Sequence, residues 1–124
     1  MTINIEDATK ENENFRSILW TGQNLQVSLM AIQPGEDIGL EVHPDHDQFF
    51  RLEKGKGVFE CGPSKDEITS STPIEGDWAV MVHKGTWHNI RNTGEKVMKL
   101  YTIYGPAHHA PGTIHVTREE DEHA

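Results

Sequence analysis

The chain has 124 residues, of which 35% are hydrophobic, and this is enough for one compact domain. Its formal net charge of −9 disfavours nucleic acid and anionic membrane surfaces as partners, and no apolar run approaches the roughly 18 residues of a membrane span. The polar, acidic start is unlike a secretory signal and the single cysteine, Cys61, allows no internal disulfide, so we expect a cytoplasmic protein.

Residues 1–14 contain few apolar positions and are expected to form an N-terminal arm, either loose or as a short helix. After them, short apolar runs alternate with Gly, Pro and Asn, a pattern typical of strands and turns. The predicted strands cover residues 15–21, 25–33, 38–43, 48–53, 58–61, 67–70, 78–82, 87–91 and 97–104.

Residues 54–57 contain two glycines and are expected to form a hairpin turn. Residues 105–124 follow the last strand as a C-terminal extension whose acidic tail, 118–122, is expected to be solvated. Short strands at this spacing, with no convincing helical stripe, predict an all-β sandwich or barrel in one domain over residues 15–104.

Polar side chains that should face the same side of their strands lie on either side of the turn at residues 44–47. Because side chains alternate between the two faces of a strand, Glu41 and His43 point the same way, and an antiparallel return lets Gln48 face them. Three polar groups inside a barrel need partners, because an unpaired buried polar group is costly. A metal ion would satisfy all three.

His88 could supply a fourth ligand. It follows a predicted strand and a glycine turn, and so could reach the same interior from across the barrel. The parity that gathers the other three polar groups also places Phe50 and Leu52 inside, where their apolar surface is removed from water. One carboxylate, two imidazoles and one amide suit a divalent Mn, Fe, Co, Ni or Zn ion.

The spacing of these residues resembles the two motifs of the cupin superfamily. In the usual first motif, G-x5-H-x-H-x3–4-E-x6-G, His43 aligns with the second histidine and Gly55 with the closing glycine. Glu41 stands where the first histidine usually is, and Gln48 where the glutamate usually is. In the usual second motif, G-x5-P-x-G-x2-H-x3-N, the matching residues are Gly76, Gly85, His88 and Asn92.

The resemblance covers about residues 25–104 and implies a double-stranded β-helix, or jelly-roll cupin barrel, with Glu41, His43, Gln48 and His88 as metal ligands. Similarity to mannose-6-phosphate isomerase-like small cupins implies Lewis-acid isomerase or lyase chemistry on a small oxygen-rich substrate, either a sugar or a keto acid. Glu41 would then also act as a catalytic base. Cupins commonly pair, so the resemblance also implies a homodimer formed through residues 1–14 and 105–116.

Three other functions stay open. The two histidines and one carboxylate also form the facial triad of an Fe-dependent dioxygenase. Alternatively, the barrel is non-enzymatic and binds a small-molecule ligand, or Glu41 and Gln48 only bond to their neighbours. An enzyme should have a pocket beside a metal site and a candidate base, whereas a binding barrel needs only the pocket.

The remaining histidines are not assigned to the metal. His46 breaks the parity pattern and is expected at the rim, and His83 is expected in a loop, in the place of the motif proline. His108 and His109 could form a secondary site with His115, although a plain C-terminal extension is the simpler interpretation.

Overall fold

Nine strands and two short helices make up the part of the chain that the structure, a computed structural model, describes, namely residues 1–106 and 109–122. The elements are α1 (Ile5–Glu11), β1 (Arg16–Thr21), β2 (Gln26–Ile32), β3 (Gln48–Lys54), β4 (Lys56–Gly62), β5 (Ser70–Glu75), β6 (Ala79–Val82), β7 (Trp87–Asn92), β8 (Met98–Tyr104), β9 (Ile114–His115) and α2 (Arg118–Glu122). Neither helix in these ranges has the length and apolar character that crossing a bilayer requires.

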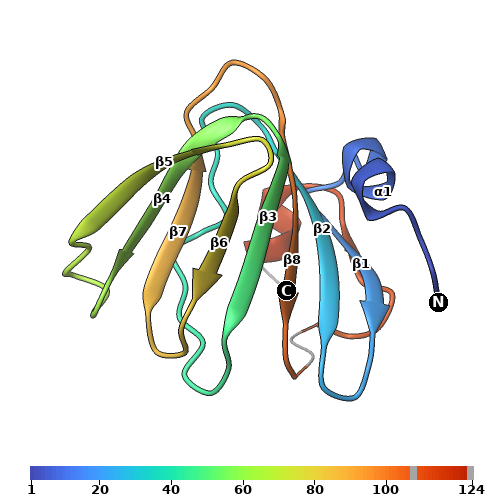
Figure 1. Ribbon diagram of the computed structural model, residues 1–124, viewed down its shortest axis with the longest axis horizontal. Helices are drawn as coiled ribbons and strands as arrows, with labels where there is room; N and C mark the ends of the chain where they lie inside the picture. Colours follow the sequence, from blue (N-terminus) through green and yellow to red (C-terminus); the bar gives the residue numbers. More distant parts are fainter. Residues whose placement is uncertain (107–108, 123–124) are drawn as a thin grey trace.

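The strands form two antiparallel sheets, which Figure 1 shows side by side around a common interior. The larger sheet has the order β6-β3-β8-β2-β1-β9, and the smaller has the order β5-β4-β7. Isolated bridges from Asp37 to Arg91 and from Glu41 to His88 add the segment 37–41 to the smaller sheet beside β7. This arrangement confirms the predicted all-β double-stranded β-helix in one domain.

Strand alternation builds the core between the sheets. In β3, Phe50 and Leu52 are only 2% and 3% exposed, whereas Phe49 and Arg51 are half-buried. Removing each large apolar side chain from water contributes roughly 1.5–3 kcal/mol. The inward side chains of neighbouring strands complete this apolar cluster, among them Met30, Ile32, Ile90, Met98 and Leu100.

Along β3 and β8 the interior changes from apolar to polar. β8 presents Leu100 to the apolar half and then, two and four residues later, the buried Thr102 and Tyr104. Gln48 of β3 is paired in register with Tyr104, and Ser28 of β2 bonds to the Tyr104 hydroxyl at 3.1 Å. One end of the barrel is therefore lined by hydrogen-bonding groups that are shielded from water.

The predicted strand at residues 38–43 is not a regular strand. Gly39 has φ +93°, a left-handed conformation that interrupts the pleat. The segment keeps only scattered ladder bonds to β7: the Ile38 N–H donates to the Ile90 carbonyl at 3.0 Å, and Glu41 N–H to the His88 carbonyl at 3.0 Å. Glu41 and His43 still lie beside β7, but their segment bonds to β7 at isolated positions and not along a continuous strand.

The predicted hairpin at residues 54–57 is also wrong, because β3 and β4 belong to different sheets. Gly55 turns the chain from one sheet to the other with φ +106°, and a Cβ there would lie 2.9 Å from the Cα of Met98. The sequence signals a glycine turn but carries no local information about which strand pairs with which. The predicted strand at residues 67–70 is displaced, because β5 spans Ser70–Glu75. It tolerates Pro73 because it is an edge strand.

The N-terminal residues contain the helix that was one of the two predicted alternatives. Asn4 caps α1 by accepting a hydrogen bond from the Asp7 N–H at 3.0 Å, which satisfies a free donor of the first turn. The helix packs against β8, β3 and β2 of the larger sheet. The N-terminal segment thus covers part of one sheet of its own chain.

The acidic tail is solvated only in part, because Glu119 and Glu120 are exposed whereas Arg118 and Asp121 are anchored to the barrel. β9 pairs with β1 of the same chain, and α2 follows it. Asp121 of α2 accepts a bond from Arg16 Nε at 2.6 Å, and Arg118 Nη2 lies 2.7 Å from Asp37 Oδ1. Because Arg16 is on the larger sheet and Asp37 beside the smaller one, these ion pairs tie both sheets together. The predicted homodimer remains a prediction.

Candidate metal centre

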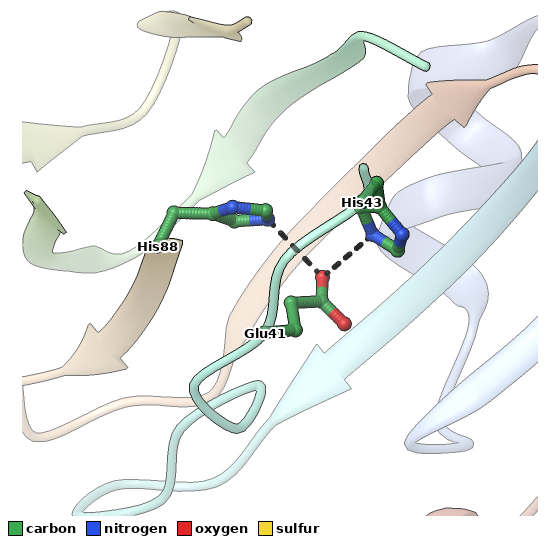
Figure 2. A group of neighbouring side chains, drawn as sticks. All are labelled: Glu41, His43 and His88. Carbon is green, nitrogen blue, oxygen red and sulfur yellow. Dashed lines mark ion pairs between the residues drawn. The ribbon is translucent and has the colours of Figure 1, made fainter. Parts of the chain in front are cut away.

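Two sheet elements bring three potential ligands together at the polar end of the barrel. Glu41 lies on the bridged segment, His43 two residues further on, and His88 on β7 (Figure 2). Glu41 Oε1 is 3.4 Å from His43 Nε2 and 3.3 Å from His88 Nε2. Ligands about 2.1 Å from a metal lie roughly 3.0–3.4 Å from one another, so these spacings suit a shared ion.

His88 presents a lone pair to this cluster. Its Nδ1 lies 2.9 Å from the Thr86 carbonyl oxygen, which can only accept, so Nδ1 carries a proton and donates it. In the neutral ring Nε2 is then an acceptor, 3.0 Å from Gln48 Oε1 and 3.3 Å from Glu41 Oε1. Acceptors that face one another at these distances repel unless a cation lies between them. A metal ion or a second proton on His88 would satisfy all three atoms.

Thr102 holds the side chain of the fourth predicted ligand, Gln48, by a hydrogen bond. The Gln48 amide donates from Nε2 to Thr102 Oγ1 at 2.9 Å, and the two residues are 6% and 1% exposed. The Gln48 Oε1 faces His88 Nε2 at 3.0 Å. The same contacts also fit the metal-free alternative, in which Gln48 only bonds to its neighbours.

Backbone bonds and ring packing hold His43 in place. The Gly85 N–H donates to the His43 carbonyl at 2.8 Å, which links the two segments that carry the motifs. The His43 ring stacks on His46 with centroids 4.5 Å apart and on Tyr104 at 6.0 Å. His43 and His88 are 6% and 1% exposed, so neither ring is free to swing into solvent.

The Glu41 carboxyl is ionised at neutral pH, as a metal ligand must be. Burial raises its pKa, but hydrogen bonds and charge interactions with His43 and His88 in their protonated forms lower it more, to about 2. Its side chain is 28% exposed, the most accessible of the three. Figure 2 shows one carboxylate oxygen between the two imidazoles and the other pointing away from both.

A groove of about 580 Å³ opens at this end of the barrel. Gln48 belongs both to its lining and to the cluster around His88, and His46 and Tyr104 line it beside His43. Small-molecule sites typically occupy concave surfaces of this size. Glu41, His43 and His88 do not themselves line the groove, so a ligand there would approach the candidate metal centre from the side of Gln48.

The structure thus brings all four sequence-predicted ligands together, since Glu41, His43 and Gln48 each lie close to His88 or to one another. His46 stands at the rim, where it lines the groove, and His83 is an exposed loop residue that also lines it. These two positions agree with the expectations from the sequence.

Of the histidines of the possible secondary site, His109 and His115 lie outside the cluster around Glu41, and His115 forms an ion pair with Asp121. His108 lies outside the described residues, while the rings of His109 and His115 meet edge to face with centroids 5.9 Å apart. His115 Nδ1 is 2.6 Å from Asp121 Oδ1, which also bonds to Arg16. Within residues 1–106 and 109–122, only Glu41, His43 and His88 have ligand atoms grouped for a metal.

Sequence reasoning missed the groups that support the ligands, namely Thr102, Tyr104 and the Thr86 carbonyl. A signal for two of them was present. Thr102 and Tyr104 share the parity of the apolar Leu100 in the predicted strand 97–104, so polar side chains facing inward could have been identified. The Thr86 carbonyl had no signal, because any residue type supplies a backbone oxygen.

Comparison with known proteins places these features in context. A family model described as the cupin domain matches residues 28–104. The uncharacterized protein YrkC of Bacillus subtilis (strain 168) is 49% identical over 118 residues, which cover 95% of this chain but 63% of YrkC. The uncharacterized protein L612 of Acanthamoeba polyphaga mimivirus is 40% identical over 119 residues, which cover 95% of this chain and 72% of L612. A crystal structure from Bacillus halodurans matches with a TM-score of 0.98 at 49% identity, covering 100% of this chain and 94% of that one.

Proposed function

Because this chain belongs to the cupin family, we propose that its barrel binds one divalent metal ion through Glu41, His43, Gln48 and His88. The observation that carries the proposal is the meeting of three acceptor atoms at His88 Nε2, at 3.0 and 3.3 Å, with Nδ1 already donating to a carbonyl. The mixed nitrogen and oxygen donors suit Mn, Fe, Co, Ni or Zn.

The proposed activity is isomerase-type or lyase-type chemistry on a small oxygen-rich substrate, a sugar or a keto acid. A bound divalent ion would supply Lewis-acid polarisation of a substrate carbonyl. Gln48 is the one proposed ligand that also lines the groove, so the substrate's oxygens would approach the ion on that side. Glu41 would act as the catalytic base, because its outer carboxylate oxygen points away from both imidazoles and its side chain is partly accessible.

Two alternatives have specific support. The two histidines and one carboxylate match the ligand set of non-haem Fe(II) oxygenases, which favours an Fe-dependent dioxygenase as the second candidate. The 580 Å³ groove alone would also serve a non-enzymatic ligand-binding barrel. Oxygen consumption in the presence of Fe(II) would favour the first, and tight ligand binding without turnover the second.

The deciding experiment is the metal content of untagged protein, measured by mass spectrometry for wild type and for His43→Ala/His88→Ala. We expect about one ion per wild-type chain and its loss in the double variant. His83→Ala, at an exposed loop position, is the matched control and should keep the metal. Circular dichroism would show that the variants are folded.

Absence of metal from wild type, even after dialysis against Mn, Fe, Ni and Zn, would overturn the proposal. A second proton on His88 would then supply the positive charge that the neighbouring acceptors require. Gln48 would be a structural hydrogen-bonding residue. Metal retained by the double variant would move the site elsewhere in the chain.

A further inference from the structure

The groove beside the candidate metal centre has an acidic rim. It is bordered by the exposed residues Asp45 and Asp47, and no lysine or arginine is among the residues that line it. Asp47 Oδ1 accepts a hydrogen bond from the Lys84 N–H at 2.9 Å, which fixes one of these carboxylates at the rim. The Lys84 side chain itself does not line the groove.

Neither Arg16 nor the lysines at the far end of the barrel offer the groove a positive charge. Arg16, whose side chain is 7% exposed, is neutralised by Asp121 through bonds of 2.6 and 3.4 Å. Lys54, Lys56 and Lys96 surround a depression at the opposite end of the barrel, since β3 runs from Gln48 at the candidate metal centre to Lys54. Among the described residues that line the groove, the side chains that can become cationic are therefore the two imidazoles of His46 and His83, and none is a lysine or arginine.

Recognition of a phosphate group normally requires what this groove lacks. Phosphates are bound by arginine or lysine side chains, or by backbone N–H groups at a helix N-terminus. Neither helix in the described ranges contributes a residue to the lining, and the backbone N–H of Lys84 is occupied by Asp47. A phosphate held beside Asp45 and Asp47 would instead meet like charge, in a protein whose formal net charge is −9.

We infer that the groove selects an unphosphorylated hydroxy-carbonyl compound, such as a free sugar, and rejects substrates with an anionic group away from the oxygens that reach the metal. This inference rests on the proposed function and narrows its substrate class. It disfavours a sugar phosphate, and it admits a keto acid only where the carboxylate itself occupies the metal-facing position.

The test compares matched probes on full-length protein loaded with Zn²⁺. The pairs are dihydroxyacetone, D-fructose and D-mannose, each with its phosphate ester, and binding is followed by ligand-observed NMR. We expect the phosphorylated member of each pair to bind at least about tenfold more weakly, from the repulsion of two carboxylates on a dianion in screened water. The variant Asp45→Asn/Asp47→Asn should remove most of this difference, and its amide oxygens preserve the hydrogen bond to Lys84.

The variant Glu75→Gln/Glu95→Gln is the matched control. It removes the same two charges from exposed positions near the far end of the barrel and should leave the difference unchanged. Equal or tighter binding of the phosphate esters by wild type, or no binding of any uncharged probe, would overturn the inference. Metal content separates the two failures: a protein that holds no ion after dialysis against Mn, Fe, Ni and Zn refutes the proposed function, and with it this inference, whereas a zinc-loaded protein that prefers phosphate esters refutes only the inference.

Discussion

Replacing Gln48 by Glu tests whether this position is a metal ligand or a structural amide. Gln48 is 6% exposed, and its Oε1 is 3.0 Å from His88 Nε2, the same atom that Glu41 Oε1 approaches at 3.3 Å. Without metal, Gln48→Glu would place a second carboxylate beside the first in a site shielded from water. Protonating a carboxyl of ordinary pKa at pH 7 costs about 3.7 kcal/mol, which sets the upper limit of the penalty. We expect the metal-free variant to lose about 2–3.5 kcal/mol of unfolding free energy, within that limit.

With metal bound, Gln48→Glu should destabilise the protein less. A carboxylate is a stronger ligand than a neutral amide, so Gln48→Glu should raise Zn²⁺ affinity by at least about tenfold, or about 1.4 kcal/mol. Because a ligand that binds only the folded state stabilises it by mass action, saturating Zn²⁺ should recover at least that much of the lost stability. The variant's deficit in unfolding free energy should therefore be smaller with Zn²⁺ than with EDTA.

Urea unfolding with EDTA and with Zn²⁺, together with calorimetric titration of Zn²⁺, measures both quantities. Gln33→Glu makes the same change at an exposed position and should alter neither the stability nor the affinity for Zn²⁺. Gln48→Leu removes the amide altogether and should weaken Zn²⁺ binding. If Gln48→Glu loses the same unfolding free energy with and without Zn²⁺, the residue is a structural hydrogen-bonding group and not a ligand.

Three further outcomes are expected. Burial raises the pKa of Asp121, but Arg16 and His115 lower it more, so Asp121→Asn should cost about 2 kcal/mol of unfolding free energy above pH 5. Urea titrations should show this difference shrinking as the pH falls below about 4, because the Asp121 carboxyl of the unfolded chain is protonated before that of the folded protein. Glu119→Gln, on the same helix but exposed, should have almost no effect. Gly55→Ala should lower the unfolding free energy by about 2 kcal/mol or more, because φ is +106° and the new Cβ would lie 2.9 Å from a backbone atom, and a wild-type midpoint in urea would contradict this. The predicted homodimer should give a light-scattering mass twice that of the 14.0 kDa chain, whereas a monomeric mass would refute it.

The sequence determined the strand faces near the candidate site. Side-chain alternation alone was enough to place Gln48 on the same side as Phe50 and Leu52, because every residue of a β-strand points opposite to its neighbours. Glycine turns and motif spacing also indicated that Glu41, His43 and His88 would approach one another. Side-chain alternation and glycine turns are local properties, since each depends on residues a few positions apart or on a regular period, whereas the approach of His88 was indicated by the resemblance to the cupin motifs.

Tertiary structure decided everything that depends on which segments meet. The glycine turn at Gly55 gave no sign that it joins two different sheets, because strand partners are chosen by packing across the whole barrel. The same holds for the support of Gln48 by Thr102, 54 positions away. The acidic tail illustrates the limit best: a run of charges usually stays in water, yet Asp121 is drawn onto β1 because Arg16, 105 positions earlier, needs a partner for its buried charge.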